Sequence, residues 1–146
     1  MFDILEVHRD ELTISTDPKR LDVNTISDFL SRAYWAQGRT RAKLERALKN
    51  SLVFGVYHDR QQIGLARVVS DYAIFAYLCD VFIHEDYRAR GIGKWLMATV
   101  FAHPELQGLR RWALVTIDAH GLYQSFGFTT LNNPEEWMEK LVFSPT

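Results

Sequence analysis

Hydrophobic and polar residues follow two different periods along this chain, and together they predict both strands and helices. Strand-like runs, rich in β-branched and aromatic residues, occupy residues 12–16, 51–57, 63–69, 73–83 and 112–117. Apolar residues at helical spacing run from residue 22 to about residue 34, from 40 to 49, and from 92 to about 102. Strands and helices therefore share the chain, as in a domain whose sheet is covered by helices.

Capping and turn residues mark the ends of these elements. Asp22 and Thr40 are typical helix N-caps, Gly38 separates the first two helices, and Pro104 ends the third. The turn at residues 59–61 joins two strands into a hairpin, which makes that pair antiparallel.

Shorter patterns fill the C-terminal part. Residues 122–126 are predicted to form a short helix closed by Gly127, and Phe128 begins another strand. A turn at residues 133–135 leads to a last strand at residues 137–143, whose apolar spacing would also suit one helical turn.

The order of the elements predicts how the strands pair. The helix at residues 92–102 lies between the strands at 73–83 and 112–117, and a right-handed crossover of this kind places those strands parallel. With the hairpin, this indicates an α/β chain with a mixed sheet. We expect residues 1–146 to form one domain, because the chain has an ordinary domain length and no repeat, linker or low-complexity segment.

The stretch at residues 81–96 combines an apolar strand, a polar turn and a glycine-spaced entry into a helix. Arg88, Gly91 and Gly93 fit the pattern R-x-x-G-x-G, in which positions without side chains let backbone N–H groups approach a phosphate. The helix that follows directs its positive dipole end at the same point. The pattern predicts a site for a phosphate-bearing cofactor, although glycines that only serve helix packing would give the same letters.

Spacing excludes two other phosphate loops. A dinucleotide fingerprint requires G-x-G-x-x-G, whereas this stretch has two glycines and no strand-ending acidic residue about twenty positions later. A Walker loop requires Gly-Lys followed by Ser or Thr, whereas Trp95 follows Gly93 and Lys94.

This stretch resembles motif A of the GNAT family of acetyl-CoA-dependent N-acetyltransferases, written R/Q-x-x-G-x-G/A, including Tyr87 just before the arginine. Downstream, residues 119–128 read Ala-His-Gly-Leu-Tyr-Gln-Ser-Phe-Gly-Phe and resemble motif B, written A-x-x-L-Y-x-x-x-G-F. Two motifs in order and at the family's spacing are specific. The resemblance implies a GNAT-like central mixed, mostly antiparallel twisted sheet flanked by helices, with a splayed parallel strand pair that forms the coenzyme A slot.

The resemblance also implies which residues bind acetyl-CoA. Backbone groups of residues 81–83 would hold the pantetheine arm like an added strand, and the Arg88 side chain with the loop amides would cradle the pyrophosphate. The implied cofactor-binding residues are Val81, Phe82, Ile83, Arg88, Ala89, Arg90, Gly91, Ile92, Gly93 and Lys94. Thr116 stands where the family often has Asn, so a pantetheine contact from this position is left open.

Acetyl transfer to an amine requires a neutral amine and a proton for the departing thiolate. Tyr123 occupies the position whose family counterpart protonates the thiolate, and the other interpretation is a packed helix tyrosine. Asp80 is the general-base candidate because its apolar neighbours would raise its pKa, while a paired structural aspartate or a base role for water stays open. His84, Glu85 and His120 are weaker candidates, because lone histidines and loop residues are usually structural.

The predicted activity is transfer of an acetyl group to a primary amine, foremost of a small molecule, by direct attack in a ternary complex. Tyr34 and Trp35, with Asp71 and Tyr72 before the long strand, would form an aromatic and acidic mouth for a cationic amine, or would only seal the core edge. Two alternatives remain. One is a protein or peptide N-acetyltransferase with an open groove, and the other is a non-catalytic acyl-CoA-binding regulatory module.

Composition argues against several other functions. The formal net charge is −1 with charges mixed along the chain, so no basic stripe for nucleic acid exists. Cys79 is the only cysteine, so no disulfide forms within this sequence, and its apolar strand argues against a cysteine nucleophile. No G-x-S-x-G pattern indicates a serine hydrolase, and the histidines show no metal-ligand spacing, so we expect no metal.

The termini and apolar segments bear on location and partners. The N-terminus lacks a basic start followed by an apolar run, and no segment approaches a membrane-spanning length. We therefore expect a cytoplasmic protein without a membrane partner. A monomer and a homodimer are both compatible with the sequence.

Overall fold

The structure is a computed structural model that describes residues 2–142. The chain forms two compact units, one up to Leu114 and one from Val115 onward. The first unit contains the sheet and the helices α1 to α3, and the second contains the short helix α4.

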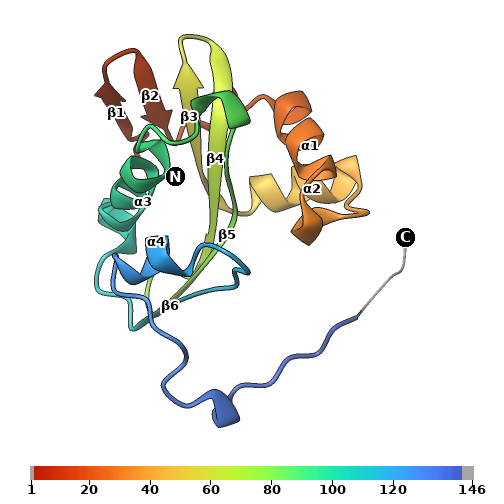
Figure 1. Ribbon diagram of the computed structural model, residues 1–146, viewed down its shortest axis with the longest axis vertical. Coiled ribbons are helices and arrows are strands. Elements are labelled where there is room, and N and C mark those ends of the chain that lie inside the picture. Colours follow the sequence, from red (N-terminus) through yellow and green to blue (C-terminus); the bar gives the residue numbers. More distant parts are fainter. Residues whose placement is uncertain (1, 143–146) are drawn as a thin grey trace. The chain divides into compact units, whose positions relative to one another are not determined.

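One six-stranded sheet forms the centre of the first unit, in the order β1-β2-β3-β4-β5-β6 (Figure 1). Neighbouring strands from β1 to β5 pair antiparallel, whereas β5 and β6 pair parallel. The strands are β1 Glu6–Arg9, β2 Leu12–Ser15, β3 Leu52–His58, β4 Gln61–Ser70, β5 Phe75–Ile83 and β6 Arg111–Leu114. The predicted mixed, mostly antiparallel sheet with one parallel pair is therefore confirmed.

Helices cover both faces of this sheet: α1 and α2 lie on one face and α3 on the other (Figure 1). The α-helices are α1 Val23–Ser31, α2 Arg41–Lys49 and α3 Ile92–Phe101, and the 3-10 helices are η1 Pro18–Arg20, η2 Tyr34–Ala36, η3 Glu85–Tyr87 and η4 Pro104–Leu106. Both predicted N-caps are confirmed. The Asp22 carboxylate accepts a hydrogen bond from the Thr25 amide at 3.1 Å, and the Thr40 hydroxyl accepts one from the Lys43 amide at 3.2 Å.

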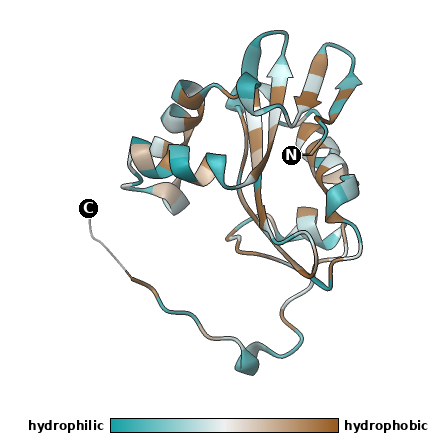
Figure 2. Cartoon of the chain, turned by 180° about the vertical axis from the view of Figure 1, so that it is seen from behind, coloured by the Kyte–Doolittle hydropathy of each residue, from teal (hydrophilic) through white to brown (hydrophobic). Residues whose placement is uncertain are grey.

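Apolar side chains of α1 and α2 pack against the central strands, which are hydrophobic over most of their length (Figure 2). Phe29 of α1 stacks on Phe82 of β5, with ring centroids 3.9 Å apart. Burying a side chain of this size stabilises the fold by about 1.5–3 kcal/mol. This contact holds α1 against β5, the strand that carries Asp80. The core therefore fixes the position of the Asp80 environment.

One strand and two element ends differ from the sequence prediction. Strand β1, Glu6–Arg9, was not predicted, because its residues are mainly polar and it depends on pairing with β2. Helix α1 ends at Ser31, where the chain turns into η2. Strand β6 ends at Leu114, and the next apolar residues, Val115 and Ile117, are 83% and 69% exposed.

The second unit contains α4 His120–Gln124 and the 3-10 helix η5 Pro134–Glu136. Gly127 has a φ of 94°, as expected of a glycine that ends a helix. Phe128 begins no strand, and residues 137–142 form neither the predicted strand nor a helical turn, while Phe143 lies outside the described residues. No helix within residues 2–142 is long and apolar enough to cross a membrane.

Candidate active site

Backbone geometry at the glycine loop leaves a row of N–H groups without protein acceptors. Gly91 is the N-cap of α3 and has a φ of 75°, in the left-handed region that favours glycine. Ala89 is also left-handed, with a φ of 62°. Among the described residues, the amides of residues 89–94 donate no hydrogen bond. Unpaired donors at the positive end of a helix dipole fit an anion such as a phosphate.

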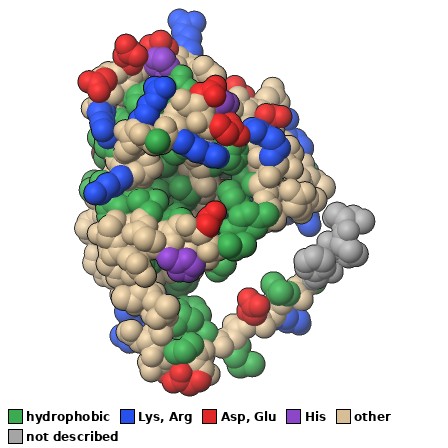
Figure 3. Space-filling model, viewed as in Figure 1, with side chains coloured by type: hydrophobic (Ala, Val, Ile, Leu, Met, Phe, Trp, Pro, Cys, Tyr) green, Lys and Arg blue, Asp and Glu red, His purple; other side chains and the backbone are tan. Residues whose placement is uncertain are grey.

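Basic side chains surround this loop. Arg88 donates from Nε to the Ile83 carbonyl at 3.1 Å, which holds its guanidinium near the end of β5. The Arg90 guanidinium lies over the Tyr87 ring, 5.3 Å from its centroid. Figure 3 shows Lys and Arg side chains mixed with Asp and Glu side chains over this end of the first unit, so the positive charge is local to the loop. The positive charge of Arg88 and Arg90 adds to the helix dipole in favour of an anionic ligand.

Arg9 of β1 is a further basic residue at the loop, and the sequence did not reveal it. Its guanidinium donates from Nη1 to the Gly91 carbonyl at 3.5 Å and lies 5.7 Å from the centroid of the Trp95 ring. Arg9 and Gly91 are 82 positions apart, so no local pattern signals this contact. The hairpin of β1 and β2 thus supplies a cation at the start of α3.

The parallel strand pair opens beyond its first residues. Strand β6 pairs with β5 only from Phe75 to Leu78, so residues 79–83 have no strand partner on that edge in the part of the chain that is described. On the opposite edge, Phe82 and Ile83 continue the ladder with β4. The open edge offers backbone groups with which an extended ligand arm can pair. This geometry agrees with the splayed pair that the family resemblance implied.

Asp80 lies at a bulge in β5 and is held by three side chains. Its φ is 52°, and the register between β4 and β5 shifts between Leu65 and Arg67. Only 1% of the Asp80 side chain is exposed. Trp35 donates from Nε1 to Oδ1 at 2.9 Å. Arg39 Nη1 and Arg67 Nε donate to Oδ2 at 2.7 Å and 2.9 Å. Both carboxylate oxygens are therefore occupied.

The expectation that apolar neighbours raise the pKa of Asp80 is wrong. Burial acts in that direction, but the hydrogen bonds and charges of Arg39 and Arg67 outweigh it, so the pKa of Asp80 lies below its usual value. A carboxylate with a lowered pKa and two occupied oxygens is a weak proton acceptor. The geometry therefore favours the other interpretation, a paired aspartate that holds its partners beside β5.

Asp80→Asn is expected to lower the free energy of unfolding by about 2 kcal/mol at pH 7, because it removes charge-assisted hydrogen bonds between a buried carboxylate and two partly buried guanidinium groups. Since the folded-state pKa of Asp80 is below the unfolded value of 3.8, its carboxylate stabilises the fold above that pH. This contribution is lost as the pH falls through the folded-state pKa. Denaturant titrations should show the full difference at pH 7 and a smaller one in acid.

Asp28→Asn provides the matched control, because the Asp28 side chain is 79% exposed and, within residues 2–142, its carboxylate pairs with Arg32 alone, one helical turn away. It should unfold like the parent protein at both pH values. If Asp80→Asn also matches the parent at pH 7, the ion pairs of Asp80 do not stabilise the fold.

The four residues expected to form an acceptor mouth lie in two places. Tyr34 and Trp35 lie together in η2, with their rings edge to face at 5.1 Å, and Trp35 reaches Asp80. Asp71 and Tyr72 lie in the turn between β4 and β5. The Asp71 carboxylate accepts hydrogen bonds from three amides of that turn at 2.9–3.1 Å. Strand β5 begins at Phe75, five residues before Asp80, so roughly 17 Å of strand separate the turn from Asp80 at about 3.4 Å per residue, and the structure does not bring the four together.

Tyr123 lies on α4 in the second unit and is 8% exposed. Its ring packs edge to face against Phe128, with centroids 5.9 Å apart. In the same unit, the Thr116 hydroxyl accepts a hydrogen bond from the Ala119 amide at 3.1 Å, so it stabilises the turn before α4. The acid role of Tyr123 stays a prediction.

The weaker candidates make structural contacts. His84 Nδ1 accepts a hydrogen bond from an amide in its own turn at 3.2 Å, and Glu85 pairs with Arg32 at 2.7 Å. His120 begins α4. Burial raises the pKa of Cys79 to about 11, so its sulfur is a neutral thiol at pH 7. Within residues 2–142, no group of three His, Cys, Asp or Glu side chains is placed to hold a metal ion.

Comparison with known proteins agrees with this geometry. A family model described as an acetyltransferase (GNAT) domain matches residues 49–130. A crystal structure from Xanthomonas campestris pv. campestris, assigned to the GNAT family, is 48% identical with a TM-score of 0.88 and covers 90% of this chain and 93% of its own. An uncharacterized N-acetyltransferase of Prochlorococcus marinus, named ycf52-like, is 34% identical over 117 residues, which are 76% of this chain and 64% of that protein.

A more distant solved structure has the same fold. It is a GNAT family acetyltransferase from Elizabethkingia anophelis with acetyl-CoA bound, with a TM-score of 0.64, 16% identity, and coverage of 90% of this chain and 88% of its own. The chain spans less than two thirds of the length of the curated relatives it matches. The family model covers the glycine loop, the open strand edge and α4 together, and the chain belongs to the GNAT family of acetyltransferases.

Proposed function

We propose that this protein transfers the acetyl group of acetyl-CoA to a primary amine of a small molecule, by direct attack in a ternary complex. The observation that carries the proposal is the row of amides at residues 89–94 without protein acceptors, next to an open strand edge. A pyrophosphate needs such donors, and a pantetheine arm needs such an edge. The acetyl-CoA bound by the Elizabethkingia anophelis relative supports this choice of cosubstrate.

The binding part of the proposal uses backbone groups first and side chains second. The amides of residues 89–94 donate to the pyrophosphate, each charge-assisted hydrogen bond contributing about 1.5–3 kcal/mol. Arg88, Arg90 and Arg9, all at this loop, balance the phosphate charge. Residues 81–83 pair with the pantetheine amides at the edge that β6 leaves open.

In the proposed chemical step, the amine loses one proton and the departing thiolate gains one. The N–C bond to the acetyl carbon forms while the C–S bond breaks. Water takes the amine proton, because the carboxylate of Asp80 is engaged by Trp35, Arg39 and Arg67. Tyr123 donates its phenol proton to the departing sulfur. Trp35 and Tyr34, which are 40% and 53% exposed, form the aromatic side of the acceptor site.

The test measures cofactor binding and acetyl transfer separately. Calorimetry of the full chain with acetyl-CoA should show one binding site. Incubation with panels of small amines and of peptides should then give free thiol and an acetylated small amine by mass spectrometry. If peptides are acetylated and small amines are not, the acceptor is a peptide or protein and not a small molecule. Binding without any transfer would make the protein a non-catalytic acyl-CoA-binding module, and no binding would overturn the proposal entirely.

A further inference from the structure

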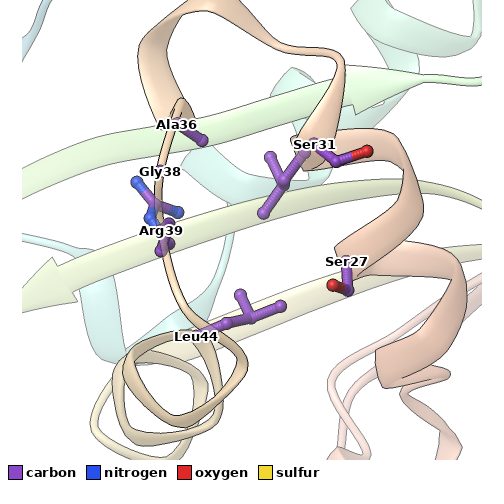
Figure 4. A pocket seen from close by; sticks show the side chains of 7 residues that line it. Ser27, Ser31, Ala36, Gly38, Arg39 and Leu44 are labelled. Carbon is purple, nitrogen blue, oxygen red and sulfur yellow. The ribbon is translucent and has the colours of Figure 1, made fainter. Parts of the chain in front are cut away.

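A small pocket lies between α1 and α2 on the face of the sheet that holds Asp80, with a volume of about 130 Å³ (Figure 4). Its lining includes Ser27 and Ser31 of α1, Arg39 of the connecting segment, and Leu44 of α2. Complete ligand sites usually measure about 300–1,000 Å³. The pocket is therefore large enough for one end of a small molecule.

Arg39 connects this pocket to the candidate active site. Its Nη1 donates to Asp80 on β5, next to the open edge at residues 81–83. In the described part of the chain, its Nε and Nη2 have no acceptor. The Arg39 side chain is 24% exposed, and its amide donates to the Ala36 carbonyl at 3.2 Å, which fixes the turn before α2. Arg39 thus presents unused donors at a defined place.

The charge balance around Arg39 is positive. Asp80 carries one negative charge and is shared between Arg39 and Arg67. The Arg67 guanidinium makes a second hydrogen bond within the protein, because its Nη1 donates to the Ser51 hydroxyl at 3.1 Å. Of the residues that the structure describes, none that lines the pocket is acidic. One guanidinium charge is therefore left over beside the pocket, and an anionic group is the partner that it favours.

Two hydroxyl groups line the same pocket and differ in their bonding. The Ser31 hydroxyl donates to the Asp28 carbonyl at 2.7 Å and points away from the pocket (Figure 4). The Ser27 hydroxyl has no hydrogen-bond partner among the described residues. Ser27 and Arg39 together offer neutral and charged donors, which is the set that a carboxylate accepts.

We propose that the acceptor is an amine that also carries a carboxylate, and that Arg39 binds this carboxylate in the pocket between α1 and α2. The proposal rests on the acetyltransferase function proposed above and names the acceptor class of that site. Arg39 acts as a specificity-determining residue: its planar guanidinium pairs with the carboxylate in bidentate fashion while Asp80 holds it in place. The expectation of an acidic mouth for a simple cationic amine is replaced by a site that selects zwitterions.

The test compares acceptors that differ only in the carboxylate. The pairs are β-alanine with n-propylamine, γ-aminobutyrate with n-butylamine, and ε-aminocaproate with n-hexylamine. At least one amino acid of these pairs should show a kcat/KM about tenfold or more above that of its alkylamine, mainly through KM. Arg39→Gln should remove this preference while the Kd for acetyl-CoA stays unchanged. Arg41→Gln is the matched control, since Arg41 is exposed on α2, pairs with Glu45, donates to Asn24 of α1 and is not among the residues that line the pocket.

If Arg39→Gln does not fold, Arg39→Lys takes its place, because it keeps the positive charge near Asp80. It should reduce the preference for amino acids over alkylamines, because an ammonium group cannot form the bidentate pair of a guanidinium. Equal rates for all pairs in the parent protein, or an unchanged preference in both Arg39 variants, would overturn the proposal but leave the acetyltransferase function intact. If no amine is acetylated, thermal shifts of parent and variant with the three amino acids test the carboxylate site independently of acetyl transfer. No shift in the parent overturns it, and a shift lost in the variant supports it.

Discussion

Tyr123→Phe is expected to lower kcat about a hundredfold while the Kd for acetyl-CoA stays unchanged, since general acid catalysis typically contributes a factor of this size. The change removes only a hydroxyl, so the ring still packs against Phe128 and the helix α4 should persist. The departing thiolate would then take its proton from water. Steady-state kinetics with amines of different basicity, together with calorimetry of acetyl-CoA, measure the two quantities.

Tyr57→Phe is the matched control for this experiment. Tyr57 lies on β3, and its hydroxyl is buried without a hydrogen-bond partner among the described residues. Removing that hydroxyl should leave kcat unchanged and the fold at least as stable. If Tyr123→Phe equals the parent protein with every amine, then Tyr123 is a packing residue and another group protonates the sulfur.

Gly91→Val is expected to weaken acetyl-CoA binding about a hundredfold or more. A side chain at the N-cap of α3 would displace the phosphate from the loop amides, and the loss of two charge-assisted hydrogen bonds of about 1.5–3 kcal/mol each gives this size. The φ of 75° adds a second effect, because a left-handed valine also costs roughly 1–2 kcal/mol of stability. Calorimetry for affinity and denaturant unfolding for stability separate the two.

Gly108→Val reproduces the backbone effect without touching the loop. Gly108 has a φ of 72°, and a Cβ at this position meets no atom within 4 Å. It should lose a similar amount of stability and bind acetyl-CoA normally. Equal affinities of the folded Gly91→Val and Gly108→Val proteins would show that the glycine loop does not hold the cofactor.

Local signals in the sequence predicted the elements that depend on neighbouring residues. Asp22 and Thr40 cap their helices through amides three positions away, so the pattern alone was sufficient. The glycine loop is equally local, and the crossover rule supplied the parallel pair. Strand β1 was missed because Glu6–Arg9 has no apolar alternation and is defined by its ladder with β2.

The environment of Asp80 shows where such reasoning stops. Its two arginines come from positions 41 and 13 residues away, and Trp35 comes from 45 residues away. The apolar neighbours along β5 suggested a raised pKa, but these tertiary partners lower it. Arg67 reaches Asp80 from the paired strand β4, whereas Arg39 and Trp35 reach it because the α1–α2 connection packs on β5. No periodicity in the sequence encodes the contact of that connection with β5.

The contact of Arg9 with the glycine loop couples an edge of the sheet to the candidate cofactor site. Strand β1 is short, mostly exposed and, in the sheet of the described residues, an edge strand paired with β2, so it belongs to the part of the fold that opens first. Each opening releases the Gly91 carbonyl and the Trp95 ring from the guanidinium. The Trp95 amide donates to the same Gly91 carbonyl at 3.1 Å, so its hydrogen exchange should follow the fraying of this hairpin, well below the free energy of global unfolding. A tag or deletion at the N-terminus would loosen the cofactor loop while the core stays folded.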